Sequence, residues 1–191
     1  MAGERNVLKE HLAESAAVLR ERLGDRAPEV GIILGSGLGP LAERMEVAAF
    51  VPFGEVPHMK TSTATSHVGR FVCGRLGGRM VIAMQGRLHG YEGYSAQEVA
   101  YPVWLMHELG VGALITTNAA GAINESYQVG DFCVMADHLN FTGRNPVAGT
   151  EPDGIAFRFF SMLDAYDPTL RSLAHAVAEE AGIRVQEGVY L

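Results

Sequence analysis

Short apolar segments that run directly into glycine-rich or polar loops constrain the fold of this chain more than any other feature. Three of these segments are Val30–Leu34 before GSGLG, Met80–Met84 before QGRLHGYEGYS, and Ala113–Thr117 before TNAAGAIN. Short apolar runs bounded by glycine are typical of buried strands. Helical patterns lie between them, so the order of elements predicts an α/β fold with a mixed, mostly parallel central sheet flanked by helices. Ligands of such sheets bind beyond the carboxyl ends of the strands, where the three loops stand.

The other elements are predicted from spacing and from end signals. Apolar residues three or four apart from Leu8 to Leu23 predict an amphipathic helix that ends at Gly24. Ser95 and Glu98 form a capping box, which predicts a helix from there to Gly110. Further strands are predicted at 71–73, 131–136 and 183–191, a helix at 167–181, and a long irregular segment at 142–163.

Length, charge and cysteine content narrow the class of protein. The 191 residues are 48% hydrophobic, which suits a single domain over residues 1–191. A net charge of −7 without a basic cluster disfavours nucleic-acid binding, and no apolar run is long enough for a membrane helix. Cys73 and Cys133 each lie among apolar residues and are expected to be reduced thiols in strands, with no metal-binding spacing. Because the N-terminus also lacks a signal-peptide core, the cytoplasm is the expected location.

The three loops share donors that suit a small oxyanion. GSGLG offers backbone N–H groups and the Ser36 hydroxyl, and it lacks the glycine pattern of a dinucleotide site. Arg87 offers a fixed fork of donors, and the His89 ring offers a further donor. Glu92 is expected to orient Arg87 without touching the anion itself. The small residues of 118–121 expose backbone N–H groups. Each loop alone is equally compatible with a tight turn or a solvated Arg–Glu pair, but together they favour phosphate, held without a metal.

Several segments in the same order resemble the trimeric purine nucleoside phosphorylases, from about Pro28 to Leu191. They are ILGSGLG, GEVPHM, HVGR, MQGRLHGYEGYS, TNAAGAIN, VGDFCVMADHLNFTGRNP and RFFSMLDAYDP. The resemblance implies a nucleoside phosphorylase-like fold and a homotrimer. It also implies phosphorolysis of purine (deoxy)ribonucleosides to the free purine and (deoxy)ribose 1-phosphate. Inorganic phosphate is then the co-substrate, and no cofactor or metal is expected.

The resemblance also assigns roles to residues of this chain. Phosphate is expected to bind Ser36, His67, Arg87, His89 and the backbone of Ala119. Tyr91 is expected to face the ribose, and Phe159 to cover the sugar of a neighbouring subunit. No separate catalytic residue is assigned, because the family residues that bind the purine and assist its departure follow Leu191 in the family pattern.

The sequence ends at GVYL, where family members continue into a Gly-Pro-x-x-Glu-Thr segment. Three alternatives follow: a phosphorylase with a truncated chain, a non-catalytic phosphate-binding remnant or assembly subunit, or an enzyme whose base site comes from a partner chain. The methylthioadenosine phosphorylases are the alternative enzyme class, although their loops resemble these less. We expect the 191 residues to hold phosphate and to turn over inosine far more slowly than a complete family member, because leaving-group assistance is worth about 10²–10⁴ in rate.

Overall fold

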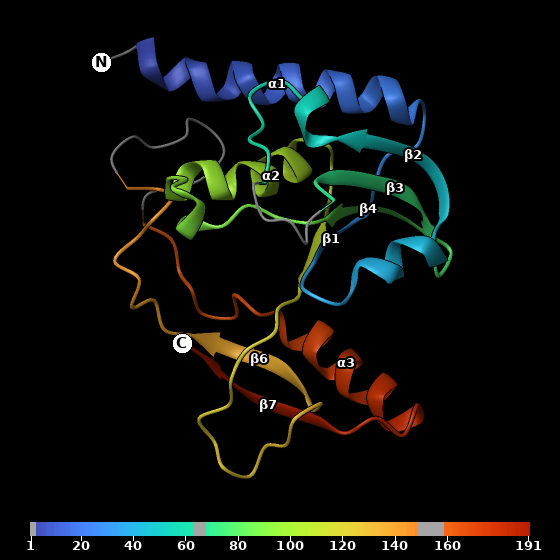
Figure 1. Ribbon diagram of the computed structural model, residues 1–191, viewed down its shortest axis with the longest axis vertical. Coiled ribbons are helices and arrows are strands. Elements are labelled where there is room, and N and C mark those ends of the chain that lie inside the picture. The colour runs from blue at the N-terminus through green and yellow to red at the C-terminus, as the bar shows by residue number, and fades with distance from the viewer. Residues whose placement is uncertain (1–2, 63–67, 149–158) are drawn as a thin grey trace. The chain divides into compact units, whose positions relative to one another are not determined.

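The computed structural model describes residues 3–62, 68–148 and 159–191, and the chain divides into two compact units (Figure 1). The first unit comprises residues 1–119 and 145–158, and the second comprises residues 120–144 and 159–191. In the first unit, helix α1 (Gly3–Leu23) is followed by strands β1 (Val30–Leu34), β2 (Glu46–Pro52), β3 (Arg70–Leu76) and β4 (Arg79–Gln85), helix α2 (Ala96–Glu108) and strand β5 (Ala113–Thr116). Three short 3₁₀ helices, at Gly39–Arg44, Phe53–Glu55 and Gly90–Glu92, lie in the connections.

The five strands of the first unit form one mixed sheet in the order β2-β3-β4-β1-β5. Strand β1 pairs in parallel with β4 on one side and with β5 on the other, in registers that match Ile32 with Ala83 and with Ile115. Strands β2, β3 and β4 are antiparallel neighbours. The predicted α/β class with parallel central pairings is confirmed, and the three predicted strands are the adjacent β4, β1 and β5.

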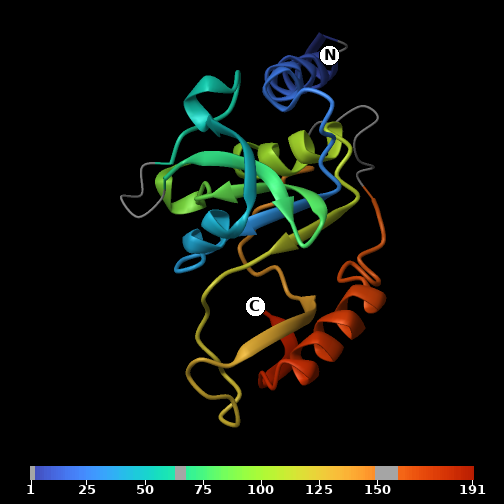
Figure 2. The same ribbon diagram turned by 90° about the vertical axis from the view of Figure 1, so that its right-hand side faces the viewer.

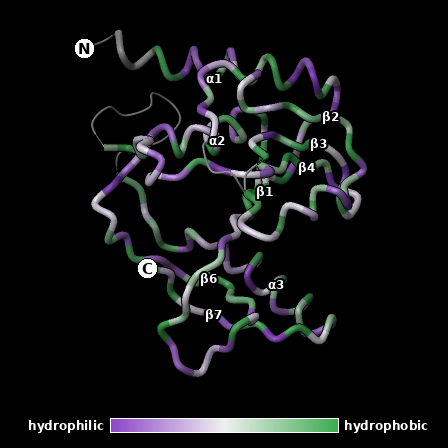
Figure 3. The backbone as a smooth tube through the Cα atoms, in the orientation of Figure 1, coloured by the Kyte–Doolittle hydropathy of each residue, from purple (hydrophilic) through white to green (hydrophobic). Residues whose placement is uncertain are grey.

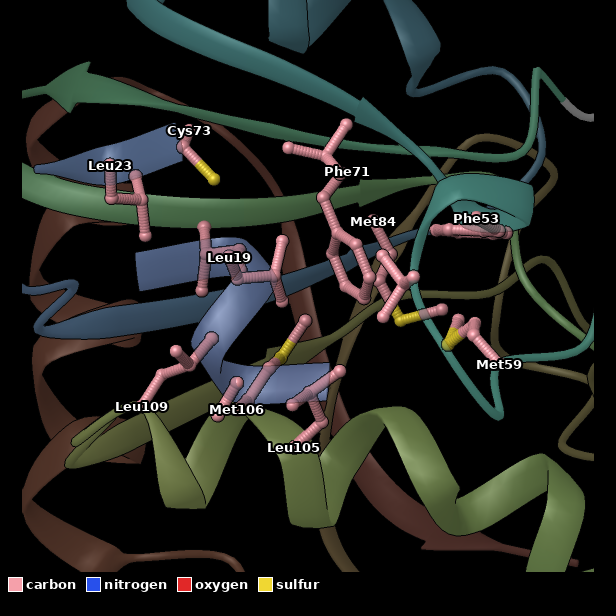
Figure 4. Close-up of a cluster of buried hydrophobic side chains, with 14 of the residues drawn as sticks. Leu19, Leu23, Phe53, Met59, Phe71, Cys73, Met84, Leu105, Met106 and Leu109 are labelled. Atoms are coloured by element: carbon pink, nitrogen blue, oxygen red, sulfur yellow. The ribbon is translucent and has the colours of Figure 1, made fainter. Parts of the chain in front are cut away.

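Both helices of this unit cover the same face of the sheet (Figure 2). Side chains of a strand alternate between faces, so Phe71, Cys73 and Ile82 point toward the helices while Val72 and Ala83 point to the other face. Figure 4 shows the cluster in which residues of α1 and α2 meet those of β3 and β4. The buried residues of this cluster are Leu12, Ala16, Leu19, Leu23, Val51, Phe53, Val56, Met59, Phe71, Cys73, Met80, Ile82, Met84, Tyr101, Leu105, Met106 and Leu109.

The predicted ends of the two helices are confirmed. Hydrophilic and hydrophobic residues alternate along α1 (Figure 3), and Gly24 follows the helix in the left-handed conformation, at φ 59°. Ser95 accepts the Glu98 N–H at the start of α2, and the Glu98 carboxylate accepts the Ser95 N–H, as in a capping box. Gly110 takes the left-handed conformation at φ 95° after α2. Among the described residues no helix has the length and apolar character to cross a membrane.

The second unit is a strand–helix–strand arrangement. Strands β6 (Phe132–His138) and β7 (Val185–Tyr190) pair in parallel, and helix α3 (Pro168–Glu180) lies between them in the chain and packs on β6. Asp167 caps α3 by accepting the N–H groups of Thr169 and Leu170, as its sequence position predicts. Glu187 of β7 accepts from Arg171 at 2.8 Å and lies 2.7 Å from His175, which ties the helix to its strand.

The two cysteines are free thiols in different surroundings. Cys73 in β3 is fully buried, and burial raises the pKa of its thiol to about 12. Cys133 in β6 is exposed. A thiol reacts as its thiolate, so burial and a high pKa both protect Cys73.

We therefore expect a disulfide reagent at mildly alkaline pH to modify one thiol per native chain and two in guanidinium chloride. The measurement is the colorimetric release of thionitrobenzoate with time. Replacing Cys133→Ser should abolish the fast native reaction, and Cys73→Ser should leave it unchanged. Rapid modification of Cys73 in the native Cys133→Ser variant would contradict the buried placement.

Candidate functional site

The carboxyl ends of β4, β1 and β5 meet at one edge of the sheet. The three strands are adjacent and parallel, so each chain leaves its strand in the same direction. The loops that follow are residues 35–39 after β1, 86–94 after β4, and 117–119 after β5. The chemistry-bearing side chains of these loops are thereby gathered within one unit, as the sequence predicts.

The first loop lies close against the end of β5. Gly35 leaves no room for a side chain, because a Cβ there would lie 2.5 Å from the Thr117 carbonyl oxygen. Ser36 follows at an exposed turn, and Gly37 takes φ 85°, a conformation that glycine adopts without strain. The far end of the loop is held by Gln85, whose Nε2 donates to the Gly39 carbonyl at 3.2 Å. Ser36 therefore stands on a turn that is anchored at both ends.

The second loop holds Arg87 and His89 against one another. Arg87 Nε donates to His89 Nε2 at 3.1 Å, and Arg87 Nη1 donates to the Thr117 carbonyl at 2.7 Å. Both side chains are partly buried. Arginine always donates, so His89 Nε2 accepts and the proton of a neutral imidazole lies on Nδ1. Neither bond uses Arg87 Nη2, so this nitrogen can meet an anion.

Glu92 fixes His89 from the other side. Its side chain is only 2% exposed, and its Oε2 accepts the His89 backbone N–H at 2.8 Å and lies 3.2 Å from His89 Nδ1. Its Oε1 accepts the Ser62 hydroxyl at 3.1 Å. Glu92 is thus linked to Arg87 through His89. Direct orientation of Arg87 by Glu92 stays a prediction.

The remaining candidate residues have different surroundings. Tyr91 is 77% exposed and stacks on His89 with ring centroids 4.6 Å apart. Ala119 is exposed in the loop after β5, two residues from Thr117. His67 lies outside the described residues. Phe159 belongs to the second unit and is 88% exposed, so its placement over a sugar stays a prediction.

Sequence reasoning did not single out two residues that organise this site. Gln85 is buried at the end of β4, where it accepts from Arg70 Nε at 2.7 Å and donates to Gly39. Thr117 bonds to Gly35 and to Arg87. Gln85 is the last residue of β4 and Thr117 directly follows β5. A polar residue where an apolar run ends was the signal that could have identified both.

Chemically, the site offers donors rather than acceptors. The Arg87 guanidinium, the Ser36 hydroxyl and the backbone N–H groups of two loops suit a small anion. In the part of the chain that the structure describes, no group of three or more His, Cys, Asp or Glu side chains is placed to hold a metal ion.

The chain is similar to known proteins over most of its length. Residues 29–191 match the phosphorylase superfamily. Purine nucleoside phosphorylase 1 of Geobacillus stearothermophilus is 45% identical over 180 residues, which cover 94% of this chain and 65% of that protein. The Bacillus subtilis (strain 168) protein of the same name is 44% identical over 183 residues, covering 96% and 67%.

The fold is also shared with solved structures. Isoform 2 of purine nucleoside phosphorylase from Schistosoma mansoni, in complex with cytosine and ribose-1-phosphate, matches with a TM-score of 0.89 and 41% identity. The match covers 95% of this chain and 65% of that one, so the chain spans about two thirds of the length of these relatives. The chain belongs to the phosphorylase superfamily and, within it, to the purine nucleoside phosphorylases.

From the donor geometry we expect inorganic phosphate to bind at this edge of the sheet. Replacing Arg87→Ala should weaken phosphate binding by about 1.5–3 kcal/mol, the worth of a hydrogen bond to a charged group. Isothermal titration calorimetry with inorganic phosphate measures this change in binding free energy. Arg75→Ala is the matched control, because Arg75 bonds to the Gly78 carbonyl on the exposed β3–β4 turn. Equal affinity of the Arg87 variant and the unchanged chain would remove Arg87 from the site.

Proposed function

We propose that the chain carries the phosphate-binding part of a purine nucleoside phosphorylase, in which phosphate is held by Ser36, His67, Arg87, His89 and the Ala119 backbone. One observation carries the proposal: Arg87, braced by His89 and the Thr117 carbonyl, lies where three strand-end loops converge. The Schistosoma mansoni relatives were solved with inosine and with ribose-1-phosphate, the substrate and product classes that such a site requires.

The reaction follows from an anion held at a fixed place. A phosphate oxygen attacks C1′ of the nucleoside while the bond from C1′ to the purine nitrogen breaks, and the purine leaves with the electron pair and takes up a proton. The sugar passes through an oxocarbenium-like state, which the phosphate charge stabilises. Holding phosphate at this position supplies proximity, and donors that are already oriented need little reorganisation. Inorganic phosphate is thus a co-substrate, and the proposed chemistry requires no other cofactor.

The residues next to the phosphate are assigned to the sugar. Tyr91 stacks on His89 and is exposed, so one face of its ring is covered by the phosphate-binding side chain. Its proposed role is to face the ribose. Phe159 is proposed to cover the sugar of a neighbouring subunit in a homotrimer. The proposed location is the cytoplasm, which suits the two free thiols.

The test of function is competition between ribose 1-phosphate and inorganic phosphate. We expect the two to compete for one site on the 191-residue chain, and Arg87→Ala to weaken both. Ribose 5-phosphate is the control, because its phosphate is on the wrong carbon for a product of phosphorolysis. Any hypoxanthine released from inosine should require phosphate. Release without phosphate, or a chain that binds phosphate and not ribose 1-phosphate, would contradict a phosphorylase.

The proposed homotrimer is tested separately by sedimentation velocity at micromolar concentration. The expected species has three times the 20.5 kDa mass of one chain. Replacing the exposed Phe159 by Ser should weaken ribose 1-phosphate binding and leave phosphate binding near its original value. A folded monomer that binds ribose 1-phosphate with undiminished affinity in the Phe159 variant would contradict the shared sugar site.

A further inference from the structure

Thr117 is the residue at which the three strand-end loops touch. It directly follows β5, its hydroxyl bonds to the backbone on both sides of the end of β1, and its carbonyl accepts from Arg87 in the loop after β4. Thr117 is small and uncharged, and no contact with a ligand is proposed for it. Its importance lies in what it connects.

The hydroxyl is used in both directions. Thr117 Oγ1 donates to the Ile33 carbonyl at 2.9 Å and accepts the Gly35 N–H at 2.7 Å. The Thr117 N–H also donates to the Ile33 carbonyl, at 3.1 Å. A hydroxyl has one donor and two acceptor positions, so these two bonds use its donor and one acceptor. The side chain thereby extends the β1–β5 ladder one step beyond the last strand pair, Ile33 with Thr116.

The bond to Gly35 sets where the first loop begins. Gly35 lies directly against the Thr117 backbone, where a Cβ would be 2.5 Å from the carbonyl oxygen. A hydrogen bond and a close backbone approach thus fix the same residue. Ser36 comes next in the chain, so the position of Gly35 also determines where the Ser36 hydroxyl and backbone N–H lie.

The bond to Arg87 sets where the guanidinium lies. Arg87 Nη1 donates to the Thr117 carbonyl at 2.7 Å, which is a charge-assisted hydrogen bond to the same residue that holds Gly35. A shift of Thr117 therefore moves a phosphate-binding loop and a phosphate-binding cation together. Gln85 differs in this respect, because it anchors the Gly39 end of the first loop and its recorded bonds do not reach Arg87.

We propose that Thr117 is a positioning residue for bound phosphate: its hydroxyl and carbonyl hold the Gly35–Ser36 turn and the Arg87 guanidinium in one fixed arrangement. This inference rests on the proposed function of the site. Donors that bind one phosphate together must be held in fixed positions, because small misplacements lose much of the binding and rate advantage that fixed orientation gives.

The experiment compares three single variants by calorimetry with inorganic phosphate. Thr117→Val keeps the shape and removes the hydroxyl, which leaves the Gly35 N–H without its acceptor, and we expect phosphate binding to weaken about 10-fold. Thr117→Ser keeps the hydroxyl and should bind phosphate within about 2-fold of the unchanged chain. Thr116→Val is the matched control, because Thr116 is the preceding β5 residue with an exposed side chain, and it should leave the affinity unchanged.

A double-mutant cycle separates positioning from a general loss of stability. If Thr117 acts through Arg87, the Thr117→Val, Arg87→Ala double variant should lose less affinity than the product of the two single losses. A purely structural role would lower the unfolding temperature of Thr117→Val and leave the affinity of the folded protein as it was.

The outcomes distinguish this inference from the proposed function. If the chain binds phosphate and Arg87→Ala weakens it, a folded Thr117→Val variant of unchanged affinity would overturn the role of Thr117 alone. If Thr117→Val does not fold, Thr117→Ser decides, since a 10-fold loss in that folded variant would show that the hydroxyl is not what positions the site. A chain that binds no phosphate at all would overturn both.

Discussion

The site depends on the parallel pairing of β1 with both β4 and β5. Three neighbouring strands that point the same way must deliver their loops to the same edge, whatever the loops contain. If β4 were antiparallel to β1, Arg87 would follow it at the opposite edge from Ser36. The buried faces of the sheet maintain this order. Alternate side chains of β3 and β4 pack against α1 and α2 on one face, and the others join a second buried cluster, with Leu34 and Met45, on the other face. A one-residue slip would exchange the two faces, so the core also maintains the register.

A chain with a net charge of −7 is not suited to attract phosphate by its overall field. The proposed donors of the site act locally: they are the Arg87 guanidinium, which is held by His89 and the Thr117 carbonyl, and the Ser36 hydroxyl. The carboxylate of Glu92 accepts the His89 backbone N–H and lies 3.2 Å from His89 Nδ1, so this negative charge next to the site is already bonded. For the proposed phosphate site, local donors of this kind suit a small anion better than a long polyanion, which would also meet the net negative charge of the chain.

Much of the fold was predictable because its signals are local. The capping box at Ser95, the glycines after α1 and α2, and the Asp167 cap each depend on a few neighbouring residues, and all of them appear in the structure. Strand β2 was not predicted. It is an edge strand whose residues are mostly exposed, with an irregular pairing between Val47 and Ala49, so its sequence shows little alternation. In the site, Arg87, His89 and Ser36 were identifiable by residue type and loop position. Gln85 and Thr117 were not, because their importance lies in bonds to residues 30 to 84 positions away in the chain.

The close approach of Gly35 to Thr117 also restricts how this protein can change over generations. A side chain at position 35 would strike the backbone of position 117, so a replacement there is tolerated only if the end of β5 shifts as well. Such a shift would also move the Thr117 carbonyl that holds Arg87. A substitution of Gly35 would therefore displace the Arg87 guanidinium. We therefore expect substitutions at positions 35, 87 and 117 to be coupled in their effect on the site. We expect substitutions of Gly35, and substitutions of Thr117 that remove its hydroxyl, to be poorly tolerated although neither side chain is proposed to touch the substrate, whereas serine at position 117 should be tolerated.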